Sequence, residues 1–309
     1  MAAWAKLKAR AGSGRRHPWR WTGVALVIVI ALGAGGYVAF HRARPYLHGS
    51  NCEVRTAGGK MPLDLEQAAN AATIAAVAFR KRLPERASVI AYATAIQESH
   101  IRNLPGGDRD SVGMFQQRPS QGWGSPEKLR DPVQATSKFF DALVKVKDYL
   151  DRDLHDAAQI VQRSADGDAY AQHEPEGKIL ARAFTGREPA SVRCWFSPDK
   201  KTAPRRAEAI REMRRAFGGR LQVDTPEASL TRTENQAVTP GTPGSSPGHD
   251  AVKVTTARSG WAVAHWAMTH AQSYGLTEVR HDGKRWLAAA GHDGWTPDRN
   301  APKDRVFIR

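Results

Sequence analysis

The carboxylate best placed for chemistry is Glu98, which lies near the end of a predicted helix over residues 84–99. Ala91 and Ala95 precede it at helical spacing, so Glu98 shares a face with small apolar side chains. Partial burial and the negative end of the helix dipole both raise the pKa of a carboxyl group, as a general acid requires near neutral pH. From position alone, a solvated residue in a last helical turn is the simpler interpretation.

The segment after Glu98 changes that interpretation. Gly106, Gly107 and Gly113, together with Pro105 and nearby aspartates, have the composition of a long loop rather than of another helix. An apolar run, Gly113–Gln116 (GMFQ), then follows. The chain therefore leaves Glu98 through a loop and comes back in this apolar segment. We call Gly113–Gln116 the returning run.

Glu98-Ser99 followed by Gly113–Gln116 resembles the E-S … G-L-M-Q signature of soluble lytic transglycosylases. The longer pattern, which adds His100 and Gly107-Asp108-Arg109, is similar to goose-type lysozymes, although the loop is shorter. The resemblance spans residues 63–186. It implies a lysozyme-like fold that cleaves peptidoglycan glycan strands, with Glu98 as the general acid.

The same resemblance bears on what attacks the sugar. If water attacks, a second carboxylate should orient it, and Asp108 is the candidate from the Gly-Asp-Arg match, with Asp110 as runner-up. Both aspartates are also typical turn caps in a glycine-rich loop. If the 6-hydroxyl of muramic acid attacks, Glu98 serves as acid and then base, and a 1,6-anhydro product forms. We favour the anhydro route.

Substrate contacts are expected from the returning run and the segments that follow it. Trp123 is equally consistent with core packing and with a platform for a sugar ring. The family's A-Y-N-A-G tyrosine, which contacts the catalytic acid, is missing from residues 161–165, where Gln162 can hydrogen-bond a carboxyl or acetamido group instead. The predicted substrate-binding residues are Ser99, Gln116, Gln117, Trp123 and Gln162.

Two functions of different class follow. Glu98 and the returning Gly-x-x-Gln run favour a glycan-cleaving enzyme, either a lytic transglycosylase or a muramidase. The missing tyrosine favours a non-catalytic, lysozyme-fold protein that binds or scaffolds the cell wall. No cofactor or metal is expected for either.

Charge and hydropathy indicate an exported protein held at a membrane. The chain has 309 residues and a formal net charge of +15, and residues 1–50 contain eight Lys or Arg and no acid. Residues 21–40 carry no charge and are long enough to span a bilayer of roughly 30 Å. Six basic residues precede this segment, so the N-terminus is expected in the cytoplasm and the main domains outside. A cleaved signal peptide is the main alternative, but no convincing cleavage site follows.

The basic charge suits anionic wall polymers or lipid, and no nucleic-acid-binding motif is present. The partners expected are therefore glycan strands and, through one helix, the lipid bilayer. Cys52 and Cys194 are the only cysteines, and in an exported domain such a pair indicates a disulfide rather than a metal site.

The predicted fold is mainly α. Its parts are a basic cytoplasmic tail (1–20), a transmembrane signal anchor (21–40), a stalk (41–62), a lysozyme-like helical domain with a loop or short β region (63–221), a flexible linker (222–256) and a small α+β accessory domain (257–309). Caps at Asp64 and Asp131 start two of the helices. In the last part, residues 278–286 should form a hairpin that turns at Asp282-Gly283, and His265 and His281 should be packing or surface residues.

Overall fold

Two alanine-rich helices position Glu98 in the computed structural model: α2 (Leu65–Arg80) and α3 (Glu85–Ser99). The capping box is confirmed, since Asp64 and Gln67 each bond the other's backbone amide. Because the alanine side chains of α2 are small, neighbouring helices can pack closely against it on all sides. It packs against α3, α5 (Pro132–Leu143), α9 (Arg206–Phe217) and α11 (Ala257–Thr269).

The structure describes residues 49–164, 168–197, 199–200, 202–219, 221–224 and 250–309. Asp131 caps α5 by accepting from the amides of Val133 and Gln134, as its Asp-Pro start indicates. The remaining helices are α4 (Pro126–Leu129), α6 (Leu154–Gln162), α7 (Asp168–Ala171), α8 (Glu174–Phe184) and α12 (Ala271–Tyr274), with short 3-10 turns at Pro119–Gln121 and Ala288–Asp293.

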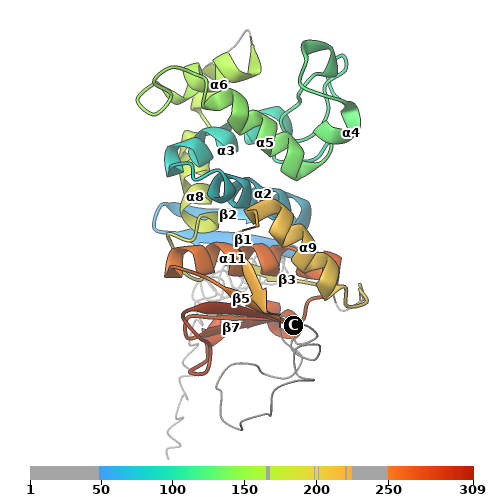
Figure 1. Ribbon diagram of the computed structural model, residues 1–309, viewed down its shortest axis with the longest axis vertical. Coiled ribbons are helices and arrows are strands. Elements are labelled where there is room, and N and C mark those ends of the chain that lie inside the picture. Colours follow the sequence, from blue (N-terminus) through green and yellow to red (C-terminus); the bar gives the residue numbers. More distant parts are fainter. Residues whose placement is uncertain (1–48, 165–167, 198, 201, 220, 225–249) are drawn as a thin grey trace, which may run out of the picture. The chain divides into compact units, whose positions relative to one another are not determined.

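Two antiparallel sheets accompany the helices (Figure 1). The smaller sheet has the order β2-β1-β3, formed by β1 (Asn51–Thr56), β2 (Gly59–Leu63) and β3 (Val192–Trp195). The larger has the order β4-β5-β9-β6-β7-β8. Its strands are β4 (Gln222–Asp224), β5 (Asp250–Lys253), β6 (Glu278–His281), β7 (Lys284–Leu287), β8 (Thr296–Pro297) and β9 (Arg305–Ile308).

The expectation of a mainly α fold is wrong. The structure is mixed, with 47% helix and 17% strand. The predicted stalk contains β1 and β2, where Cys52 and Val54 alternate inward while their neighbours are less buried. The ends of the predicted linker form β4 and β5, which pair with each other. β1 and β5 also pair with β3 and β9, which lie far along the chain, so local composition gave little sign of these short strands.

The predicted disulfide is confirmed. Cys52 in β1 and Cys194 in β3 are directly opposite in the register of the smaller sheet, and they are bonded across 142 residues of sequence. Both side chains are almost completely buried. The bond therefore ties the first strand of the described chain to the strand that follows α8.

Residues 257–309 share one hydrophobic core with the helices and lie in the same compact unit, Gly49–Arg309. Helix α11 lies between the larger sheet and the helices α2 and α8 (Figure 1). Gly186 permits this contact, because a Cβ there would lie 2.0 Å from the carbonyl oxygen of Arg258. The indoles of Trp286 and Trp295 donate to backbone oxygens of β3, at 3.1 and 2.8 Å. The hairpin turns at Asp282-Gly283 as expected, with positive φ at both residues.

The predicted tail (1–20) and signal anchor (21–40) lie outside the described residues, as do residues 41–48 of the stalk and 225–249 of the linker. Within the described residues, every helix is too short or too polar to cross a bilayer.

Candidate active site

The backbone turns sharply beneath Glu98, immediately after α3 ends. His100 and Ile101 both have positive φ, at 52° and 62°, a conformation that is strained for a β-branched residue. Two amides of α2 hold this turn: Gln67 Nε2 donates to the His100 carbonyl at 2.9 Å, and Asn70 Nδ2 donates to the Ile101 carbonyl at 2.8 Å. The end of α3, and with it Glu98, is thereby fixed on α2.

Ser99 joins this helix end to the returning run. Its hydroxyl donates to the Met114 carbonyl at 2.7 Å and accepts from the amide of Arg102 at 3.1 Å. The side chain is buried and does not line the cleft beside Glu98. The structure therefore places this predicted substrate-binding residue under the site, where it positions Met114 and its neighbours.

One oxygen of Glu98 receives both hydrogen bonds made by its carboxyl group among the described residues. The Tyr170 hydroxyl donates to Oε1 at 2.7 Å, and Gln162 Nε2 donates to the same atom at 3.1 Å. Oε2 has no hydrogen-bond donor in this part of the chain. The two bonds therefore fix the orientation of the carboxyl group and leave Oε2 without a donor among these residues.

Gln162, the last residue of α6, bridges Glu98 and the returning run. The same Nε2 donates to the Phe115 carbonyl at 2.6 Å. Since both of its partners are acceptors, the amide orientation is determined by the contacts. Its Oε1 is buried and has no hydrogen-bond partner among the described atoms.

A cleft of about 430 Å³ opens beside Glu98. Six predicted residues line it: Glu98, Asp108, Gln116, Gln117, Trp123 and Gln162. The rest of the lining consists of Ser111, Arg118, Gln121, Arg163 and Ser164. The structure thus brings together residues from α3, the loop, the returning run and the end of α6.

The loop closes around the Gln116 amide. Its Nε2 donates to the Gly113 carbonyl at 2.9 Å, and its Oε1 accepts from the Ser111 hydroxyl at 3.0 Å. A Cβ on Gly107 would lie 1.7 Å from that Oε1, so any other residue at this position would displace the amide from where it lies. Gln117 is buried and donates to the Ala135 carbonyl at 3.3 Å. Both glutamines therefore shape the cleft wall.

The two loop aspartates have different surroundings. The side chain of Asp108 is 89% exposed at the cleft edge, with Arg109 3.9 Å away. Asp110 accepts from the Ser120 amide at 2.7 Å and from Arg118 Nε at 3.0 Å. These bonds lower the pKa of Asp110 to about 2 and hold it in the loop.

Tyr170 is the functional residue that sequence reasoning missed. The resemblance predicts the tyrosine within residues 161–165, but α6 ends at Gln162 and the short helix α7 carries Tyr170 to Glu98. The Ala169-Tyr170 pair was the available signal, because the family motif begins with Ala-Tyr.

Among the described residues, the group with metal-ligand spacing is Asp153, His155 and Asp156 at the start of α6, and none of these lines the cleft. His265 and His281, which the sequence suggested as packing or surface residues, are fully buried beside Trp261. No protein-family model matches this chain, and a comparison with curated proteins finds no significant match.

Proposed function

We propose that this chain is a lysozyme-like enzyme that cleaves the glycan strands of peptidoglycan, with Glu98 as the general acid. The observation that carries the proposal is the arrangement of Glu98 at the cleft. Tyr170 and Gln162 both donate to Oε1, while Oε2 carries no donor from the described chain. A carboxyl group held this way has a fixed orientation and one oxygen free to deliver a proton.

In the proposed reaction, Glu98 protonates the glycosidic oxygen as the bond to the muramic acid carbon breaks. The resulting carboxylate is stabilised by Tyr170 and Gln162, because hydrogen bonds to an ionised acceptor are stronger than those to a neutral one. Glu98 then removes the proton from the attacking hydroxyl group.

The surroundings of the aspartates support attack by the sugar's own 6-hydroxyl. Asp110 already accepts hydrogen bonds from Arg118 and Ser120. The side chain of Asp108 is exposed to solvent, and few contacts orient it. A water-activating carboxylate needs a defined position opposite the acid. We therefore favour a lytic transglycosylase that forms 1,6-anhydromuramic acid over a muramidase.

The proposal includes export, with residues 21–40 as a single-pass anchor and residues 49–309 outside the cell. The disulfide supports this, because such bonds persist in oxidising compartments. A membrane-impermeant amine-reactive label applied to intact cells should modify lysines within residues 49–309. Labelling of these lysines only after lysis would contradict the orientation.

The deciding experiment measures cleavage of purified sacculi by the full chain in detergent. Glu98→Gln keeps the shape of the side chain but removes the acid, so turnover should fall by about 10²–10⁴-fold. Glu127→Gln, an exposed substitution on α4, is the matched control and should leave turnover unchanged. Mass spectrometry of the released muropeptides should show products lighter by one water than reducing-end products.

The alternative is a non-catalytic wall-binding protein. Sacculus binding without cleavage by both wild-type and Glu98→Gln proteins would support that alternative and remove Glu98 from any mechanism. Cleavage that yields only reducing-end products, with a large loss in Asp108→Asn, would make the protein a hydrolase.

A further inference from the structure

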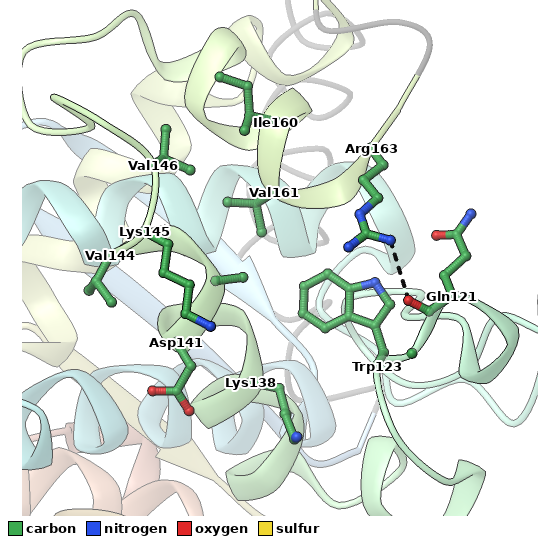
Figure 2. Close-up of a pocket in the computed structure, with 12 residues that line it drawn as sticks. Gln121, Trp123, Lys138, Asp141, Val144, Lys145, Val146, Ile160, Val161 and Arg163 are labelled. Carbon is green, nitrogen blue, oxygen red and sulfur yellow. Dashed lines mark hydrogen bonds between the residues drawn. The ribbon is translucent and has the colours of Figure 1, made fainter.

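A second hollow adjoins the cleft and is formed by α5, the loop after it, α6 and the turn around Trp123 (Figure 2). Its volume is about 710 Å³. We call it the side hollow. Gln121, Trp123 and Arg163 line both spaces, so the side hollow begins where the cleft ends.

The side hollow is positively charged. Lys138, Lys145 and Arg163 line it, and Figure 2 shows the Arg163 guanidinium group beside the indole of Trp123. Lys138 and Lys145 have no acidic partner within 4.0 Å among the described residues. The one acid of the lining, Asp141, is paired with Lys81 at 2.7 Å. An anionic ligand would therefore meet three cations and little competing negative charge.

The rest of the lining is aliphatic. Val144 and Ile160 are 47% and 51% exposed, and they are two of the four large hydrophobic residues that the described surface leaves exposed. Val146 and Val161 also line the side hollow, and both are buried. A ligand with small apolar groups between carboxylates matches this surface, whereas a neutral sugar would leave its cations unpaired.

We propose that the side hollow binds the short acidic peptide that peptidoglycan carries on the lactyl group of its muramic acid. This inference rests on the proposed function, since that function puts the muramic acid in the cleft. The peptide's alanine methyl groups fit Val144 and Ile160, and its carboxylates fit Lys138, Lys145 and Arg163. Four residues span at most about 13 Å, and the peptide has only to cross Trp123, which lines both the cleft and the side hollow.

The proposal predicts that the enzyme prefers strands that retain their peptides. In Lys138→Gln/Lys145→Gln the two charges are lost while most of each aliphatic stem remains. Each exposed ion pair contributes up to about fivefold in affinity. The double variant should therefore raise KM about 5–20-fold on peptide-bearing strands and leave it unchanged on the same strands after an amidase has removed the peptides.

The matched control is Lys128→Gln/Lys147→Gln, which removes the same charge from exposed lysines outside both hollows. This variant should behave as wild type on both substrates. An equal effect of the two double variants, or an equal effect of Lys138→Gln/Lys145→Gln on both substrates, would overturn the proposal.

A binding measurement separates this inference from the proposed function. The free peptide of alanine, glutamate and diaminopimelate is titrated into the full-length Glu98→Gln protein by calorimetry. Binding that weakens on adding Lys138→Gln/Lys145→Gln supports the side hollow even if no strand is ever cleaved. Cleavage of both strand types at equal rates, with no peptide binding, would overturn the inference and leave the proposed function standing. Lysine-dependent binding of polyglycerol phosphate but not of the peptide would assign the hollow to an anionic wall polymer and also overturn it.

Discussion

Replacing Tyr170 by phenylalanine removes one hydroxyl group and leaves the ring in its buried site. That hydroxyl donates to Glu98 Oε1 at 2.7 Å, and Tyr170 does not line the cleft. The substitution therefore tests the support of the acid without touching the space where substrate would lie.

The expected magnitude follows from the change in charge on Glu98. A hydrogen bond to an ionised group contributes about 1.5–3 kcal/mol, against about 1 kcal/mol between neutral groups. As Glu98 gives up its proton, the bond from Tyr170 should strengthen by about 1–2 kcal/mol. We expect kcat to fall about 5–30-fold in Tyr170→Phe, with KM unchanged.

The chain offers a matched control on α3, the helix that carries Glu98. Tyr92 is also buried, and its hydroxyl donates to the Ala71 carbonyl at 2.8 Å, but it does not contact Glu98. Tyr92→Phe should lower the free energy of unfolding by about 1 kcal/mol, a decrease in Tm of about 2–4 °C, without changing kcat. Steady-state release of muropeptides gives kcat and KM, and thermal unfolding gives Tm. An unchanged kcat in Tyr170→Phe, or an equal fall in both variants, would refute the assigned role of Tyr170.

Three further predictions concern the cleft wall, the core histidines and the disulfide. Gly107→Ala should raise KM several-fold because its Cβ would displace the nearby glutamine amide, whereas Gly106→Ala, with open space around its Cβ, should be neutral in the same assay. Burial lowers the pKa of His265 to about 3 and of His270 to about 4, so both stay neutral in the folded chain while the unfolded chain takes up protons below pH 6.5. The free energy of unfolding should therefore be at its full value above pH 6.5. It should fall by roughly 1.4 kcal/mol per pH unit for each imidazole as pH decreases toward 4. A urea midpoint that is constant from pH 7 to 4.5 would contradict this. Reducing the bond between Cys52 and Cys194 should lower the free energy of unfolding by about 4–5 kcal/mol, because 142 residues separate the two, and a denaturation curve unaffected by reductant would count against it.

The parts of the site that depend on local sequence were predictable. The helix that carries Glu98, the glycine-rich loop and the returning run all follow from periodicity and turn residues within about 30 positions. The contact between Gln162 and Glu98 was anticipated as a possible hydrogen bond, and the structure has it at 3.1 Å. Tyr170 could not be predicted from the motif, because α6 ends at Gln162 and the helix that carries the tyrosine begins later in the chain than the motif implies.

The strands were harder to foresee, and for a different reason. β1 pairs with β3 about 140 residues away, and β5 pairs with β9 more than 50 residues away. Each is four to six residues long and too short to show a decisive alternation on its own. To predict these strands one must know which distant segments of the chain pair with each other. Local strand propensity carries no information about that pairing.

The place of β9 in the larger sheet determines when the protein can finish folding. Residues 305–308 form an interior strand, between β5 and β6, although they come last in the described chain. During synthesis, β5 and β6 each keep one unpaired edge until those residues arrive. A chain interrupted before residue 305 would keep two open edges facing each other across a missing strand, and such edges readily pair with other chains. We therefore expect incomplete chains to aggregate or be degraded rather than to accumulate in a folded form.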